Sequence, residues 1–158
     1  MTTGQSGATP GERLAELGLE LPAVAAPLAA YVPAVRSGSW VLTAGQLPSV
    51  DGELVATGAV GGEVSAQEAY DAARTATLNA LAAVAAEIGS VDHVRRVVRV
   101  CVYVAAAPGF TALAQVANGA SDLLGEVFGD AGTHVRSAVG AAQLPLDAPV
   151  EVELVVEA

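Results

Sequence analysis

Apolar and polar residues alternate most regularly at the C-terminal end of the chain. Every second residue from 150 to 156 is valine or leucine, and Glu151 and Glu153 lie between them. A period of two predicts a strand with one buried face. Residues 136–141 are rich in small and β-branched side chains and predict a second strand. The connecting residues 144–149 contain two prolines, which disrupt the ladder inside a sheet, so a loop is expected there.

Two longer segments have the helical period. Ser65 followed by Glu68 is a capping box, which marks the first turn of a helix. This helix is expected to end at Gly89, which supplies a left-handed stop. Its apolar stripe consists of Ala69, Ala73, Ala76, Ala80, Leu81, Val84 and Ile88. A second helix is expected at about residues 110–128. Gly119 weakens it by roughly 1 kcal/mol relative to alanine, which indicates a bend or a close approach.

The remaining segments predict short elements. Residues 32–35 and 40–43 flank the turn signal Arg36-Ser37-Gly38-Ser39 and are expected to form a hairpin. The turn dipeptide Asp51-Gly52 precedes a short strand at residues 54–55.

Residues 97–104 predict a longer strand, and residues 12–20 a short helix. One face of the strand is expected to carry Val98, Val100, Val102 and Val104, and the other Arg99, Cys101 and Tyr103.

The predicted order is a hairpin, a helix, a strand, a second helix and two strands. It lacks the regular alternation of doubly wound α/β proteins. We therefore expect an α+β fold, with one mixed sheet of six strands and the two helices packed on one face. No repeat or linker divides the chain, so residues 1–158 are expected to form a single domain, with 1–20 as an N-terminal extension.

Composition and charge narrow the possible functions. The 158 residues carry a formal charge of -10, and all seven basic residues are arginines. The lack of lysine excludes Schiff-base, pyridoxal-phosphate and P-loop lysines. Nucleic acids and anionic membranes are not expected as partners, because both favour a basic surface. An apolar content of 53% indicates that the uncovered face of the sheet meets other subunits.

Targeting signals and disulfides are not expected. Residues 1–11 lack the apolar core of a signal peptide, and Cys101 has no partner cysteine. Residues 100–121 carry no charge, but Pro108-Gly109 interrupts them, so we interpret them as a strand followed by a helix rather than a membrane span. We expect a cytoplasmic protein.

The candidate catalytic residues are Arg136 and Glu151, which lie at the start of the two C-terminal strands. A guanidinium binds a carboxylate in two places, and a glutamate can orient a water or take a proton. His134 would share a strand face with Arg136, but a solvated turn histidine is favoured over a general base. Two distant histidines, His93 and His134, do not indicate a metal site, and Cys101 is interpreted as a core residue.

These residues also resemble a known family. Arg136-Ser137-x-Val139, Leu144-Pro145 and the strand at 150–153 resemble the C-terminal signature of the RidA/YjgF family. The resemblance extends back to Tyr31 and the run at 43–48. It implies a chorismate-mutase-like fold and a homotrimer with its sites between subunits.

The resemblance also implies an activity and roles for residues. Arg136 would hold the carboxylate of a 2-imino or enamino acid, and Glu151 would place the water that hydrolyses it to a 2-keto acid and ammonia, without a cofactor. Residues around Tyr31, Gly45 and Gln46 would line the pocket with Ala138, which stands where the family often has cysteine.

The chain departs from the family pattern at Gly140 and in the helical segment 118–124, which indicates a divergent subfamily. Two functions from different classes remain open. One is a hydrolytic deaminase, and the other is a regulatory trimer that binds a metabolite without turnover. The endoribonuclease label often given to the family is disfavoured by the acidic charge and the lack of lysine.

Overall fold

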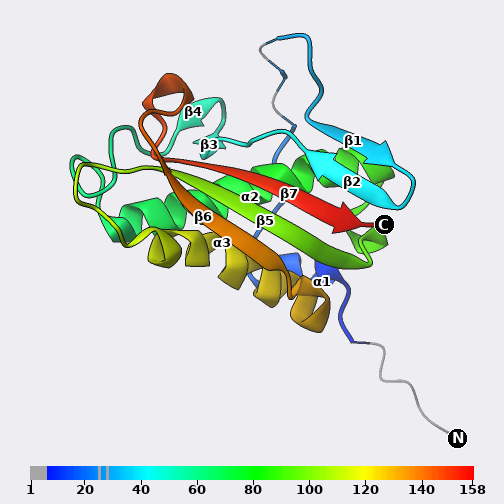
Figure 1. Cartoon of the computed structure of the whole chain (residues 1–158). Coiled ribbons are helices and arrows are strands. Elements are labelled where there is room, and N and C mark those ends of the chain that lie inside the picture. The colour runs from blue at the N-terminus through cyan, green and yellow to red at the C-terminus, as the bar shows by residue number, and fades with distance from the viewer. Residues whose placement is uncertain (1–6, 25, 28) are drawn as a thin grey trace, which may run out of the picture.

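One mixed sheet forms the centre of the computed structural model, which describes residues 7–24, 26–27 and 29–158 (Figure 1). Its strand order is β1-β2-β7-β5-β6, and only β5 and β6 are parallel. The strands are β1 (Ala34–Ser37), β2 (Trp40–Thr43), β5 (Arg96–Ala105), β6 (Val135–Ala141) and β7 (Val150–Glu157). The α+β fold class is therefore confirmed, with β1 and β6 at the edges of the sheet.

Helices cover one face of this sheet (Figure 1). They are α2 (Ala66–Ile88) and α3 (Leu113–Phe128), and the short helix α1 (Pro10–Glu16) packs against α3. The capping box of Ser65 and Glu68 begins α2, and Gly89 ends it with a φ of 93°. A second capping box, formed by Thr9 and Glu12, begins α1 earlier than its apolar residues indicate. Helix α3 begins at Leu113, three residues later than expected.

The core lies between the two long helices and the sheet. Strand β7 alternates strictly between buried and half-buried residues, as its sequence predicts. Each apolar residue on its buried face meets a valine of β5 in the ladder, such as Leu154 opposite Val100 and Val152 opposite Val102. These side chains pack beneath α2 and α3, where burial of apolar surface is the main favourable term in folding.

Two features of the sheet differ from the prediction. The main sheet has five strands rather than six, because β3 (Ser49–Val50) and β4 (Glu53–Leu54) pair only with each other. A bulge between Val97 and Arg99 shifts the alternation of β5, so Val97 is buried in place of Val98. A bulge inserts one residue into a strand, which strict alternation cannot anticipate.

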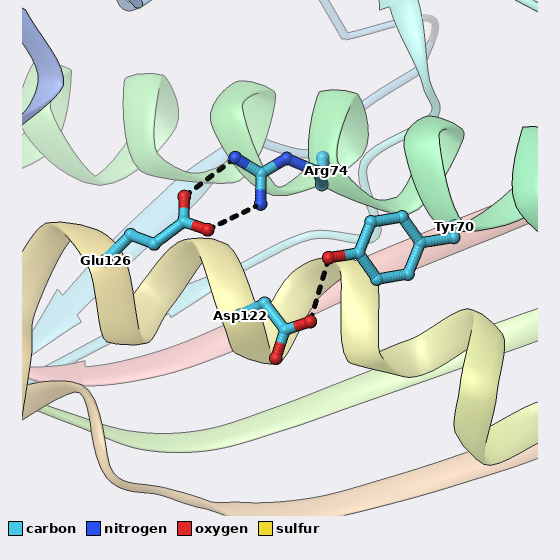
Figure 2. A network of polar contacts seen from close by, with 4 residues as sticks. All are labelled: Tyr70, Arg74, Asp122 and Glu126. Atoms are coloured by element: carbon cyan, nitrogen blue, oxygen red, sulfur yellow. Dashed lines mark hydrogen bonds and ion pairs between the residues drawn. The ribbon is translucent and has the colours of Figure 1, made fainter. Parts of the chain in front are cut away.

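Helices α2 and α3 approach each other closely at Gly119. A Cβ atom there would collide with the backbone carbonyl of Tyr70 on α2. Figure 2 shows the polar contacts beside this crossing. The Arg74 guanidinium donates to both carboxylate oxygens of Glu126, at 3.2 and 2.8 Å, and the Tyr70 hydroxyl donates to Asp122 at 2.8 Å. The expectation of a close approach at Gly119 is confirmed.

The opposite face of the sheet has no helix over it (Figure 1). It carries apolar side chains that are exposed in the single chain, namely Val35, Trp40, Leu42, Val135 and Val139. Cys101 is buried on this face rather than in the helix-covered core. Among the described residues, no helix combines the length and apolar character needed to cross a membrane.

Candidate functional site

Glu151 is placed by the backbone that follows β2. The amide of Gln46 donates to the carbonyl of Val152 at 2.8 Å, and the amide of Val152 donates back to the carbonyl of Gln46 at 3.0 Å. This pairing lays residues 44–46 along the start of β7. The carboxylate of Glu151 then packs directly on Gly45, where a Cβ atom would collide with its Oε1. Glycine at position 45 therefore leaves the space that the carboxylate occupies.

The surroundings of Glu151 favour its protonated form. Burial, and then the negative charge of Glu153, raise the pKa of the Glu151 carboxyl. Glu153 itself accepts a hydrogen bond of 2.9 Å from the Tyr103 hydroxyl. Hydrogen bonding to Cys101 and to Glu153 raises the pKa of Tyr103, so this phenol stays a donor at neutral pH. A carboxyl with a raised pKa can exchange a proton with a substrate near neutrality.

A cavity of about 360 Å³ opens beside Gly45. Its walls come from the segment before β1, from the chain between β2 and β4, and from the 3-10 turn η3 (Pro145–Asp147). They include three residues expected at the site: Tyr31, Gly45 and Gln46. The cavity is thus lined on one side by the backbone against which Glu151 packs.

Arg136 lies on the other face of the sheet. It pairs with Val100 of β5, whose side chain points into the helix-covered core. Its Nη1 donates to Asn118 Oδ1 at 2.8 Å and to Ser121 Oγ at 3.1 Å, both on α3. These bonds use both Nη1 hydrogens and leave the edge formed by Nε and Nη2, which fits a carboxylate bidentately. No carboxylate among the described residues forms an ion pair with this guanidinium.

His134, one residue before β6, contacts the same cluster. Its Nδ1 lies 2.6 Å from the carbonyl of Gly132, and its Nε2 lies 2.9 Å from Ser121 Oγ. A carbonyl only accepts, so Nδ1 carries the hydrogen, and in the neutral ring Nε2 accepts from Ser121. His134 is therefore not the solvated turn residue that we expected. Its expected position on the same strand face as Arg136 agrees with their shared partner, Ser121.

The expected site residues therefore fall into two groups within one chain. Tyr31, Gly45 and Gln46 line the cavity, and Glu151 packs on Gly45. Arg136 and Ala138 instead lie on β6, facing the side of the sheet that α3 covers. Glu151 pairs with Tyr103, and this row of the ladder points to the uncovered face. One chain alone does not bring Arg136 and Glu151 together.

The partners of Arg136 on α3 were not predicted. Asn118 and Ser121 are three residues apart, a spacing that places two side chains on one helical face. This spacing is the signal in the sequence that could have indicated them. Among the described residues, no three His, Cys, Asp or Glu side chains gather in a way that could hold a metal ion.

Comparison with known proteins agrees with this architecture. The family model described as "YjgF/chorismate mutase-like, putative endoribonuclease" matches residues 11–158. Protein TCP17 of Trypanosoma cruzi is 46% identical over 145 residues, which is 91% of each chain. The crystal structure of a putative endoribonuclease from Shewanella oneidensis MR-1 superposes with a TM-score of 0.93 at 36% identity, covering 96% of this chain and 100% of its own.

A more distant structure holds a ligand. TdcF of Escherichia coli, solved with bound serine, is 26% identical with a TM-score of 0.62, and the match covers 86% of this chain and 93% of TdcF. Sequence motifs, sheet topology and the match over almost the entire length lead to one assignment. The chain belongs to the RidA/YjgF family, with its chorismate-mutase-like fold.

Proposed function

We propose that this protein hydrolyses reactive 2-imino and enamino acids to 2-keto acids and ammonia. The observation that carries the proposal is the pair of complementary groups on β6 and β7. The Arg136 guanidinium has a free bidentate edge, and the Glu151 carboxyl has a raised pKa beside a cavity. The first suits a substrate carboxylate and the second suits proton transfer at the adjacent carbon and nitrogen.

The two groups would meet between copies of the chain. Arg136 and Glu151 point to opposite faces of the sheet, so a complete site requires Arg136 of one copy and the Glu151 cavity of the next. We infer a homotrimer, because a cyclic assembly repeats one such contact and closes without leaving a partner surface unused. The exposed apolar side chains on the uncovered face of the sheet support this assembly.

The reaction consumes one water and needs no cofactor. Glu151 takes a proton from the water as its oxygen bonds to the imine carbon, and the π electrons of C=N move to nitrogen, which receives this proton from Glu151 to give a neutral carbinolamine. Glu151 then takes the remaining proton from the hydroxyl as the keto C=O bond forms and the C–N bond breaks, and it delivers this proton to the nitrogen, which leaves as ammonia. Arg136 holds the carboxylate throughout and keeps the carbon beside Glu151.

Direct hydrolysis tests the proposal. An L-amino-acid oxidase acting on alanine or leucine generates the imine in the assay, and trapping the imine with semicarbazide measures how much escapes hydrolysis. Added protein is expected to lower the trapped fraction, and Glu151→Gln and Arg136→Ala to abolish this effect. A wild-type protein that leaves the trapped fraction unchanged would contradict the proposal.

A metabolite-binding protein without turnover is the second candidate. The serine bound to TdcF favours it, because serine is an amino acid and not an imine. In this case 2-oxobutyrate would bind through Arg136, while the wild type would leave the imine untouched. RNA cleavage is not proposed, since a chain with a charge of -10 offers little attraction to phosphates.

A further inference from the structure

The cavity beside Glu151 is larger and more apolar than a small substrate needs. Its volume is about 360 Å³. Its apolar wall includes Tyr31, Pro33, Leu47, Leu54 and Leu146. An imine derived from alanine carries only a methyl group beyond the reacting carbon. Most of this apolar surface would then face water, and the usual reason for a largely apolar pocket is to bury apolar ligand surface.

Leu146 has a second unusual property, which is independent of the cavity volume. Its φ of 59° and ψ of 21° are in the left-handed region, and Asp147 follows with a φ of 61°. Leucine rarely adopts this conformation, because its Cβ crowds the backbone. The amide of Gly58 holds the turn by donating to the carbonyl of Asp147 at 2.9 Å.

The side chain of Leu146 in this strained turn is exposed rather than buried. Leu146 lines the cavity and yet is 67% exposed in the single chain. A leucine held in an unfavourable conformation at the mouth of a cavity is a candidate for ligand contact, because folding alone gives no reason to place it there.

The geometry of the proposed site determines which group of the substrate enters the cavity. With the substrate carboxylate on Arg136 of a neighbouring copy and the imine carbon near Glu151, the side chain of the substrate is the third group on that carbon. Glu151 packs on Gly45, and Gly45 lines the cavity. The substrate side chain therefore extends along Gly45 toward Leu54 and Leu146.

We propose that this site prefers 2-imino acids with a branched aliphatic or aromatic side chain, and that Leu146 sets this preference. The inference rests on the proposed function, since it names the substrate class of the same site. The imines that fit are those formed by oxidation at the α-carbon of leucine-like and phenylalanine-like amino acids.

The experiment compares two imines on three proteins. The imines of leucine and alanine are generated by the same L-amino-acid oxidase, and kcat/KM is measured for the wild type, Leu146→Lys and Leu17→Lys. Leu17 is the matched control, because it is also an exposed leucine but lies at the end of α1, outside the lining of the cavity. Thermal melting verifies that each variant is folded.

We expect the wild type to favour the leucine-derived imine by about tenfold or more, since each methylene in an apolar pocket contributes roughly that factor. Leu146→Lys should lower kcat/KM for this imine about tenfold and leave the alanine-derived imine within about twofold. Leu17→Lys should match the wild type. Hydrolysis without preference, or a preference unaffected by Leu146→Lys, would overturn the inference while the deaminase proposal stands.

If the protein hydrolyses neither imine, keto-acid binding tests the apolar site separately from the deaminase proposal. Calorimetry compares 4-methyl-2-oxopentanoate with 2-oxobutyrate on the same three proteins. Tighter binding of the branched acid that depends on Leu146, without hydrolysis of either imine, would support the apolar site and overturn the deaminase. Equal binding of both acids, or binding of neither, would overturn the apolar site.

Discussion

Arg136 is held through one of its two terminal nitrogens. Nη1 donates to Asn118 and Ser121, and Ser121 is held in turn by His134. Asn118 and Ser121 are both neutral acceptors, so the guanidinium keeps its full charge for a ligand. The arrangement orients the Nε–Nη2 edge without competing for it.

Loss of Arg136 tests whether this edge binds the ligand. Arg136→Ala leaves a bound carboxylate without its cation, at a cost of about 2–5 kcal/mol, or very roughly 30- to 5000-fold in the Kd for 2-oxobutyrate. Arg136→Lys should recover little, because an ammonium cannot form the planar fork. Melting is measured on the same samples. A lowered Tm with unchanged affinity would instead assign Arg136 to the scaffold.

The positioning role of Ser121 has a narrower test. Ser121→Ala removes the hydrogen bond that the hydroxyl accepts from the Arg136 guanidinium and the one that it donates to His134. If the looser orientation of Arg136 costs about 0.5–1.5 kcal/mol of binding, the Kd for 2-oxobutyrate should rise roughly 2- to 12-fold. Ser121→Thr keeps the hydroxyl and should restore the affinity. If alanine and threonine behave alike, the hydroxyl does not orient Arg136.

Glu151 makes stability depend on pH. Because burial and the charge of Glu153 raise its pKa, the folded chain binds this proton more tightly than the unfolded chain. Stability therefore falls as pH rises from the unfolded pKa of about 4.3 to the raised folded value, and stays lowered above it. We expect Glu151→Gln to melt at a higher temperature than the wild type at about pH 7, with the difference closing below about pH 4.

Melting curves of both proteins across this pH range test whether Glu151→Gln raises or lowers the melting temperature. Glu20→Gln is the matched control at an exposed position and should follow the wild type throughout. A Glu151→Gln variant that melts below the wild type at neutral pH would show that the carboxylate stabilises the fold, contrary to this reasoning.

At the scale of elements, the junction of α2 and α3 depends on a missing side chain. Gly119→Ala places a Cβ against the carbonyl of Tyr70, and overpacking of this kind costs about 1–3 kcal/mol. The gain in helix propensity, about 1 kcal/mol, offsets only part of this cost. We expect a lower Tm and partial loss of the Arg74–Glu126 and Tyr70–Asp122 contacts (Figure 2).

Gly125 on the same helix provides the control. A Cβ there meets no atom within 4 Å. Gly125→Ala therefore gains only propensity and should raise stability by up to about 1 kcal/mol. Opposite signs for the two substitutions in urea unfolding would separate close packing from propensity, and equal signs would contradict the close approach.

Elements with a local signal could be predicted from sequence, and those fixed by distant contacts could not. The capping box and Gly89 define α2 within a few residues, and alternation defines β7. The bulge at Val97 and the separation of β3 and β4 from the main sheet depend on pairing with distant strands. The cavity combines walls from three separate segments, so no single motif indicates it.

At the scale of the whole molecule, the uncovered face of the sheet is the surface through which the proposed trimer would form. Val139 on β6 is 41% exposed there, and Trp40 on β2 is 47% exposed. If three copies join through this face, light scattering should give a mass near three times the 15.6 kDa of one chain at micromolar concentration. A monomer under these conditions would also remove a site shared between copies.

Val139→Glu links assembly to activity. Its side chain points to the uncovered face, opposite to Arg136, and the variant alters neither Arg136 nor Glu151. A glutamate buried without a partner in an interface costs several kcal/mol, which should dissociate the trimer and abolish imine hydrolysis together. Leu17→Glu, away from this face, should remain trimeric and active. A monomeric Val139→Glu that still hydrolyses the imine would mean that one chain contains the whole site, so Arg136 would not be its carboxylate ligand.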